Sequence, residues 1–168
     1  MRALYVGRFQ PFHRGHIHNV KKILEENDEL IIGIGSAQYS HTLKNPFTCS
    51  ERIEMIRRTI DDLSRVIIIP ITDLHIHALW VRHVCNIVPK FDVVYSNEPL
   101  TVRLFKEEGF LVKSLPLYSR DFYNSTKIRS KIIKGENWKE NVPKEVYNFI
   151  KEIKGDERLR EIAKSDKI

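Results

Sequence analysis

Five short apolar runs alternate with amphipathic segments along the first two thirds of the chain. The runs are rich in valine and isoleucine, whereas the segments between them repeat apolar residues at the spacing of a helix face. The pattern predicts strands at residues 3–6, 30–34, 66–69, 93–95 and 111–114, and helices at 16–26, 50–63, 79–88 and 100–108. Because strands and helices alternate, we expect a doubly wound α/β fold, in which a parallel sheet of about five strands carries helices on both faces.

After residue 115 the pattern holds helices alone, without a linker or an internal repeat. It predicts helices at residues 126–134 and 143–153, and a charged tail that packs as a helix and loosens after Lys164. Two glycines are expected to stop the first two of these helices: Gly135 and Gly155. Earlier in the chain, Thr48 and Glu51 have the spacing of a capping box at the start of the predicted helix 50–63.

The chain has 168 residues, the size of one domain. We therefore expect a single domain, with a parallel α/β core over residues 1–115 and a small helical part over residues 116–168. No apolar stretch approaches the roughly twenty residues of a membrane helix, and a strand begins where a leader would stand, so we expect a cytoplasmic protein without a membrane partner. Its two cysteines, Cys49 and Cys85, form neither a metal-binding pair nor a disulfide framework.

The net charge is +6. This charge is compatible with a nucleic-acid partner or with a small anionic ligand. Lysine and arginine are interspersed with acidic residues along the predicted helices, and they do not gather into a basic arm or stripe. The distribution of charge therefore argues against a nucleic-acid partner.

Residues 7–16, Gly-Arg-Phe-Gln-Pro-Phe-His-Arg-Gly-His, directly follow the first predicted strand. A strand that ends in glycine and leads into a helix presents backbone N–H groups and the positive end of the helix dipole to an anion. His13 and His16 add two imidazoles to the same spot, and Gly15 permits close approach of the backbone. The segment predicts a phosphate site, although a short motif of this kind also occurs as an ordinary strand–turn–helix with surface histidines.

A second candidate anion site is Ser125-Thr126-Lys127-Ile128-Arg129. A hydroxyl residue would cap the predicted helix, its free N–H groups would face outward, and Arg129 would hold phosphate oxygens with its planar set of donors. The alternative is a capped helix with a surface arginine. Since the segments with candidate chemistry all follow predicted strands, we expect them to share one site at the carboxyl edge of the sheet.

Taken together, the two segments resemble the signatures of the His-x-Gly-His nucleotidyltransferase superfamily. The longer string at residues 7–16 narrows the resemblance to the short archaeal type of nicotinamide mononucleotide (NMN) adenylyltransferase. Further matches extend it over nearly the whole chain: Gly35-Ser36-Ala37-Gln38, Asn45-Pro46-Phe47-Thr48, Ala78-Leu79-Trp80-Val81 and residues 118–129. The resemblance implies a Rossmann-like fold, a homo-oligomer that is a hexamer in related enzymes, and the reaction of ATP and NMN to NAD and pyrophosphate with Mg²⁺.

The resemblance also implies roles for individual residues. The catalytic residues would be Arg8, His13, His16 and Arg129, with His16 at the α-phosphate and the two arginines at the β- and γ-phosphates. The ATP-binding residues would be Gly7, Arg8, Phe9, His13, Gly15, His16, Ser96, Asn97, Tyr123, Ser125, Thr126, Ile128 and Arg129. The NMN-binding residues would be Phe9, Ser36, Gln38, Lys44, Phe47, Trp80 and Val81. We expect no permanent metal site, because magnesium would be held mainly by ATP and water.

Some of these assignments have alternatives. Trp80 would stack on the cationic nicotinamide ring, or else belong to the core of its helix, and Phe47 has the same two options. Lys44 stands where related sequences commonly have arginine, and a lysine lacks the bidentate geometry of an arginine. Three histidines suggest a zinc cluster, but no fourth ligand stands at a structural spacing, so solvated loop histidines are favoured: His75, His77 and His83.

Two other functions are compatible with the same motifs. One is a different adenylyl- or cytidylyltransferase of the superfamily, acting on pantetheine phosphate or FMN. The other is a non-catalytic module that senses NAD or NMN, although such a module would not need both histidines.

Overall fold

The computed structural model describes residues 1–165 of the chain. The strands are β1 (Arg2–Gly7), β2 (Glu29–Ile34), β3 (Val66–Pro70), β4 (Val93–Tyr95) and β5 (Leu111–Lys113). The helices are α1 (Arg14–Glu26), α2 (Cys49–Thr59), α3 (His77–Ile87), α4 (Pro99–Glu107), α5 (Ser125–Lys134), α6 (Lys144–Glu152) and α7 (Gly155–Ser165), with a 3-10 helix, η1 (Lys139–Asn141), before α6. Strands and helices alternate as far as β5 and only helices follow, which confirms the predicted order.

The five strands form one parallel sheet in the order β3-β2-β1-β4-β5. In the register of the sheet, Tyr5 of β1 lies between Ile32 of β2 and Tyr95 of β4. After β1, the chain adds β2 and β3 on one side of this strand and then β4 and β5 on the other side. The order in which strands are added therefore reverses at β1, the central strand. This is the doubly wound topology that the sequence pattern predicts, and ligands of such sheets bind outside the carboxyl ends of strands at this point.

The described residues form two compact units that are interleaved in the sequence. The first unit consists of Met1–Gly7, Asn19–Ala37 and Asp62–Pro116, and it contains the whole sheet. The second unit consists of Arg8–His18, Gln38–Asp61 and the chain from Leu117 onward.

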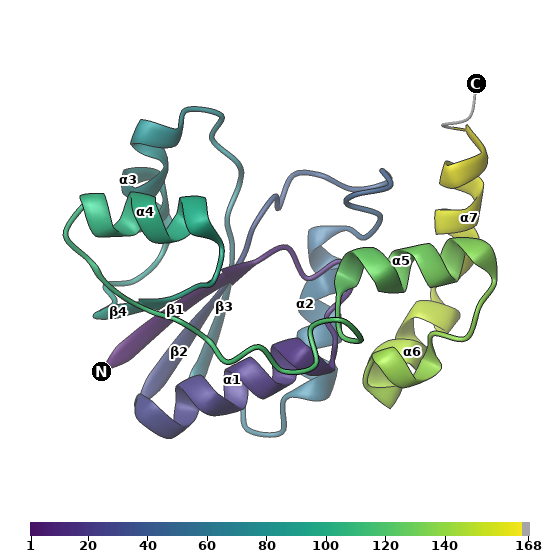
Figure 1. Cartoon of the computed structure of the whole chain (residues 1–168), viewed down its shortest axis with the longest axis horizontal. Coiled ribbons are helices and arrows are strands. Elements are labelled where there is room, and N and C mark those ends of the chain that lie inside the picture. Colours follow the sequence, from purple (N-terminus) through teal and green to yellow (C-terminus); the bar gives the residue numbers. More distant parts are fainter. Residues whose placement is uncertain (166–168) are drawn as a thin grey trace. The chain divides into compact units, whose positions relative to one another are not determined.

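In the first unit, helices cover both faces of the sheet (Figure 1). On one face, α3 and α4 pack through Val81, Val84 and Phe105 against strand residues that include Leu4 and Ile31. On the opposite face, α1 follows the sheet, where Asn19 donates a hydrogen bond to the Tyr5 hydroxyl and Asn27 donates one to the Tyr95 hydroxyl. Because successive residues of a strand point to opposite faces, the continuous apolar strands bury side chains on both sides of the sheet.

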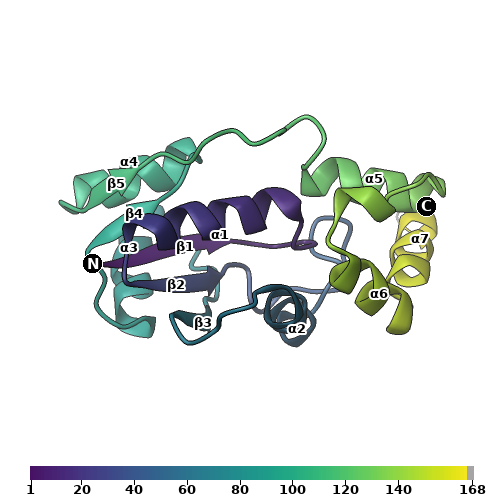
Figure 2. The same cartoon turned by 90° about the horizontal axis from the view of Figure 1, so that it is seen from below.

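In the second unit, α5, α6 and α7 pack together and α6 also contacts α2 (Figure 2). The capping box predicted at the start of α2 is present, with Thr48 accepting from the Glu51 N–H and the Glu51 carboxylate accepting from the Thr48 N–H. Arg158 of α7 donates to both oxygens of the same carboxylate at 2.8 and 2.9 Å. A single carboxylate thus caps α2 and fastens α7 to it.

The ends of some helices differ from the prediction. The helix predicted over residues 50–63 ends at Thr59, because Ile60 is extended and the Asp62 carboxylate accepts two hydrogen bonds from Ser64 in the turn that follows. Conversely, α1 begins at Arg14 rather than at residue 16, which leaves His16 in the first turn, as predicted. The expected loosening after Lys164 falls mostly on residues 166–168, outside the described part of the chain.

Gly135 ends α5 in the left-handed conformation, as predicted, but Gly155 does not end a helix. The left-handed residue after α6 is Lys154, with φ of 55°, and Gly155 is the first residue of α7. A Cβ at Gly155 would lie 2.8 Å from Cε1 of Phe47 and 3.2 Å from Cγ2 of Ile150. The position needs glycine for space rather than for backbone conformation. None of the helices found over residues 1–165 is both long and apolar enough to cross a membrane.

We predict that Gly155→Ala lowers the free energy of unfolding by about 1–3 kcal/mol, because the added methyl group overpacks the contact with Phe47. Guanidinium denaturation measures the change. The matched variant is Gly135→Ala, where nothing lies within 4 Å of the new Cβ and only the left-handed backbone costs about 1 kcal/mol. A Gly155→Ala protein as stable as the wild type would show that α7 moves freely to accommodate the methyl group.

Candidate functional site

The loop that follows β1 is anchored by two buried aromatic rings, Phe9 and Phe12, in the second unit. The Phe9 ring packs edge-on against the rings of Phe12 and His16, with centroids 5.6 and 4.9 Å apart. Phe9 has φ of 53°, a left-handed conformation that a bulky residue adopts only when its surroundings impose it. The loop therefore has a defined shape, set by burial of its apolar side chains.

The two histidine rings are stacked on one another at the start of α1. The ring centroids of His13 and His16 lie 3.6 Å apart with 20° between the planes, and the Phe12 ring is also stacked with that of His16, with centroids 5.4 Å apart. Nδ1 of His13 accepts a hydrogen bond from the Gly15 N–H, and Nδ1 of His16 accepts one from the His13 N–H. Because each Nδ1 is an acceptor, the proton of each neutral ring resides on Nε2, which makes each Nε2–H a hydrogen-bond donor.

Gly15 allows this arrangement, as the sequence predicts. A Cβ at this position would lie 3.0 Å from Cε1 and 3.1 Å from Nδ1 of His13, and 3.3 Å from Cβ of Tyr123. The glycine lets the backbone N–H reach the imidazole, and that hydrogen bond fixes the orientation of the His13 ring.

Both imidazoles are held in the neutral form. Burial lowers the pKa of His13 to about 4. Burial also places the pKa of His16 well below its ordinary value, and a charge on His13 would lower it further. Near neutral pH, the start of α1 therefore presents uncharged N–H donors.

Arg129 of α5 supplies positive charge in the same unit. Its side chain is 6% exposed, Nη1 donates to the backbone carbonyl of Gln10 at 2.9 Å and Nη2 donates to the Thr126 hydroxyl at 3.4 Å. Burial, and to a lesser extent the charge of Arg8, lower the pKa of Arg129 to about 10. Over residues 1–165 its hydrogen-bond partners are all neutral, so the buried charge lacks a carboxylate. Such a charge favours the binding of an anion.

Gln10 connects three segments of the second unit. Its side chain is 1% exposed, and its amide accepts from the Phe47 N–H at 2.9 Å and donates to the Phe47 carbonyl at 3.0 Å. Its own backbone carbonyl is the acceptor for Arg129. The side chain of one residue thus fixes the loop before α2 and orients the carbonyl that holds the buried guanidinium.

A pocket of about 300 Å³ lies beside Arg129 along α5. It is lined by Leu43, Lys44, Thr126, Arg129, Ser130, Ile133 and Lys134. Lys44, which the resemblance assigns to NMN, lines this pocket together with Arg129 and Thr126. Three cationic side chains around one pocket fit a ligand with several negative charges.

Other residues of the predicted site lie in the second unit with a changed role. Asn124, not Ser125 or Thr126, caps α5 by accepting from the Lys127 N–H, because its amide oxygen reaches the third helical N–H. The Ser125 hydroxyl instead donates to the Pro11 carbonyl, which joins α5 to the histidine loop. The rings of Tyr118 and Tyr123 stack, and His18 stacks on Tyr118.

Several predicted contact residues are buried in the second unit. Phe9, Phe47 and Ile128 have side chains at most 2% exposed. The burial of Phe47, together with the hydrogen bonds of its N–H and carbonyl to Gln10, corresponds to the alternative of a core residue. Because the side chains of Phe9 and Ile128 are buried, these residues can contact a ligand only through their backbone. Gln38 is exposed on the loop that follows β2.

The remaining predicted residues lie in the first unit. Ser36 has φ of 50°, and its hydroxyl donates to Asp73 at 2.8 Å, just after the carboxyl ends of β2 and β3. At the same edge, Gly7 ends β1 and its carbonyl accepts from the Gly35 N–H. Ser96 and Asn97 follow β4, where the Asn97 side chain bonds the backbone N–H and carbonyl of Leu115.

Trp80 and Val81 occupy the start of α3. Trp80 is partly buried, and its ring packs edge-on against Phe105 with centroids 5.6 Å apart, while Val81 belongs to the apolar core. His83 bonds the Thr72 carbonyl and hydroxyl. Within the described range there is no group of three or more potential ligand side chains that could hold a metal ion.

Sequence reasoning missed the contacts of Gln10, of Asn124 and of Arg52, a buried arginine of α2 that donates to the Arg8 carbonyl. Asn124 had a recognisable signal, because asparagine is among the best helix-capping residues and stands directly before the helix. Gln10 and Arg52 had none, because their partners are backbone groups far away in sequence.

Comparisons with known proteins show which family the chain belongs to. Residues 4–131 match the family described as cytidylyltransferase-like. The chain is 53% identical to a protein of Archaeoglobus fulgidus and 54% identical to one of Saccharolobus solfataricus, each named nicotinamide-nucleotide adenylyltransferase, with 99% of both chains covered in each case.

Among solved structures, the chain resembles a bifunctional NMN adenylyltransferase/ADP ribose pyrophosphatase from Francisella tularensis, which was crystallised with AMP and a manganese ion. The TM-score is 0.80 at 25% sequence identity. The match covers 99% of this chain and 52% of that protein, so the chain spans about half of the bifunctional protein's length.

We predict that His13 makes stability depend on pH between about 6.5 and 4. Because the folded pKa lies below the unfolded one, the unfolded chain takes up a proton first as pH falls, and stability that is complete above pH 6.5 is lost toward pH 4. Denaturant unfolding at pH 7.5 and 5.0 is expected to show about 2 kcal/mol less acid destabilisation in His13→Gln than in the wild type. The exposed His77→Gln is the control, and equal pH dependence in all three proteins would contradict the prediction.

Proposed function

Because this chain belongs to the cytidylyltransferase-like family, we propose that it is a nicotinamide-nucleotide adenylyltransferase that forms NAD and pyrophosphate from ATP and NMN. The observation that carries the proposal is the buried guanidinium of Arg129, which has only neutral partners over residues 1–165 and belongs to the same unit as Arg8 and the stacked histidines. Full-length identity above 50% to proteins of that name supports the choice of substrates.

The reaction suits a site made of donors and cations. An oxygen of the NMN phosphate is anionic near neutral pH, so it can attack the α-phosphorus of ATP without a general base. A new P–O bond forms as the bond between the α-phosphorus and the bridging oxygen breaks, and pyrophosphate leaves with the electron pair. The protein then has to align two anions and to stabilise negative charge on the leaving group.

The second unit supplies these functions in our proposal. His13 and His16 donate from Nε2 to the phosphates, with His16 at the α-phosphate, and both remain neutral because their pKa values are lowered. Arg8 and Arg129 hold the β- and γ-phosphates. Lys44, which lines the pocket beside Arg129, shares that task. The first N–H groups of α5 add donors at Ser125 and Thr126.

The nucleoside parts are assigned to residues that follow the strands of the first unit. We propose that Trp80 stacks on the cationic nicotinamide ring and that Ser36 and the backbone of Val81 complete its surroundings. Ser96 and Asn97 contact adenine or its ribose. These assignments rest on the resemblance of the motifs.

Magnesium is expected to enter this site bound to the nucleotide and not to protein side chains. The side chains of the phosphate site are N–H donors and cations, whereas magnesium takes oxygen ligands. The bound metal would come with the ATP phosphates and offset part of their charge. We further propose a cytoplasmic homo-oligomer, a hexamer by resemblance to related archaeal enzymes.

We predict that the purified protein forms NAD from ATP, NMN and Mg²⁺, and that His16→Ala lowers kcat by about a hundred- to a thousandfold, since one preorganised donor at a developing charge is lost. A coupled alcohol dehydrogenase assay measures NAD. The control is His77→Ala, an exposed histidine outside the phosphate site. Wild-type protein that binds ATP but makes no NAD would refute the assignment and direct the assay to pantetheine phosphate or FMN as acceptor.

We predict that Trp80→Leu raises KM for NMN by about tenfold and leaves KM for ATP within a factor of about two, because the change removes the aromatic face but keeps an apolar side chain against Phe105. Initial rates with each substrate varied in turn provide both constants, and thermal unfolding reports on packing. If Trp80→Leu lowers the melting temperature but leaves both KM values unchanged, Trp80 is a core residue and does not contact NMN.

A further inference from the structure

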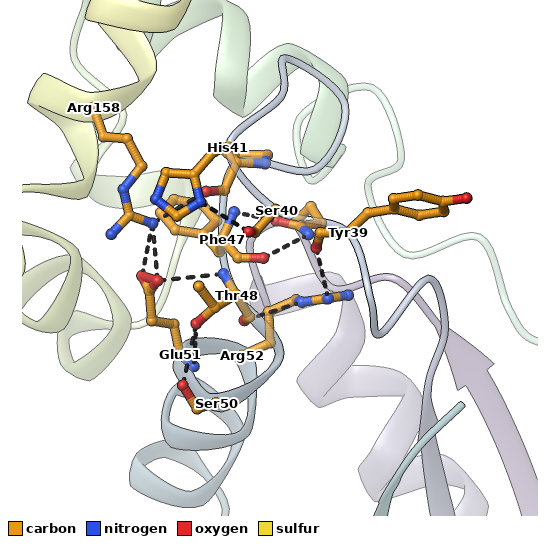
Figure 3. A network of polar contacts seen from close by, with 11 residues as sticks. Tyr39, Ser40, His41, Phe47, Thr48, Ser50, Glu51, Arg52 and Arg158 are labelled. Atoms are coloured by element: carbon orange, nitrogen blue, oxygen red, sulfur yellow. Dashed lines mark hydrogen bonds and ion pairs between the residues drawn. The ribbon is translucent and has the colours of Figure 1, made fainter. Parts of the chain in front are cut away.

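Arg52 of α2 is a fully buried arginine whose guanidinium bonds backbone carbonyls of three different segments. Figure 3 shows its contacts with Thr48 and Tyr39. Nε donates to the Thr48 carbonyl at 3.2 Å, Nη1 to the Arg8 carbonyl at 2.9 Å and Nη2 to the Tyr39 carbonyl at 3.4 Å. Its exposed fraction is 0%, although arginine is almost never fully buried without a reason. The side chain therefore acts as an internal brace and not as a surface charge.

One of the braced carbonyls belongs to Arg8, which we assign to the ATP phosphates. The next residue, Phe9, has φ of 53°. This left-handed backbone conformation is energetically unfavourable for a phenylalanine. A charge-assisted hydrogen bond from Arg52 to the Arg8 carbonyl offsets part of that cost. The bond fixes the backbone from which the Arg8 side chain extends.

Arg52 extends from α2, a helix whose first turn is itself held in place. Thr48, whose carbonyl accepts from Arg52, caps α2 together with Glu51, and Arg158 of α7 bonds Glu51 and the Pro46 carbonyl (Figure 3). The guanidinium is thus held by a helix that is itself anchored at its start. Lysine could not reproduce the arrangement, because its single ammonium group lacks the planar spread of donors.

We propose that Arg52 is a positioning residue for ATP binding, which it supports by fixing the backbone of Arg8. The proposal rests on the proposed function for the identity of the nucleotide. Arg52 stabilises the loop conformation before the nucleotide arrives, so that less ordering has to occur on binding. Its side chain does not touch the phosphates.

The test compares Arg52→Met with Arg57→Met, which removes an exposed arginine from the same helix. Titration with ATP and Mg²⁺ in the absence of NMN measures affinity without requiring catalysis. We expect Kd for ATP to rise about tenfold or more in Arg52→Met and to stay within a factor of about two in Arg57→Met. Because this readout needs no turnover, it separates a failure of this inference from a failure to form NAD.

Arg52→Lys keeps the charge and part of the hydrogen bonding. This variant is used for the ATP titration if Arg52→Met does not fold. We expect Kd for ATP to rise about three- to tenfold in this variant with a cooperative thermal transition retained. A lysine variant that folds and binds ATP as tightly as the wild type would overturn the proposal.

A double-mutant cycle with Arg8→Ala distinguishes positioning from general stability. The carbonyl of residue 8 remains in this variant, so the hydrogen bond to Arg52 persists while the phosphate-binding side chain is absent. If Arg52 acts through Arg8, replacing Arg52 in the Arg8→Ala background should change Kd for ATP by less than about threefold. Losses that multiply in full would mean that Arg52 acts independently of the Arg8 side chain and would overturn the proposal.

Discussion

The buried charge of Arg129 is the constraint on which the candidate site depends. A guanidinium in a protein interior is costly unless hydrogen bonds and an opposite charge compensate it. Here the compensation over residues 1–165 comes from the Gln10 carbonyl and the Thr126 hydroxyl, which are neutral. Burial and the nearby charge of Arg8 accordingly lower the pKa of Arg129. A phosphate group would supply the missing negative charge, so part of the cost of this arrangement is offset when a ligand binds.

Such an arrangement requires a backbone that does not collapse around the charge. Side chains with several donors and acceptors provide that rigidity: the Gln10 amide pairs with both polar groups of the Phe47 backbone, and Arg52 bonds the carbonyls of Arg8 and Tyr39. Buried aromatic rings hold the turn between them. Preorganised donors of this kind are the main source of catalysis where a reaction needs charge stabilisation and no general base.

The sequence predicted the alternating fold, the capping box at Thr48 and the need for glycine at Gly15, because each follows from local periodicity or spacing. It could not predict that Gly155 is needed for space against Phe47, since that contact joins residues more than a hundred positions apart. For the same reason the hydrogen bonds of Gln10 and Arg52 were invisible, and so was the interleaving of the two units. Local signals located the phosphate motifs, while tertiary contacts determined their geometry.

The neutral state of the histidines completes the physical picture. Rings stacked 3.6 Å apart would repel one another if both were protonated, and burial already disfavours the charged form. Their Nδ1 atoms are occupied by backbone N–H groups, so each ring donates from Nε2 without changing its protonation state. A nucleophile that is already an anion does not need either ring to remove a proton. The positive charge is thus contributed by the guanidinium of Arg129, and the imidazoles contribute N–H donors of fixed orientation.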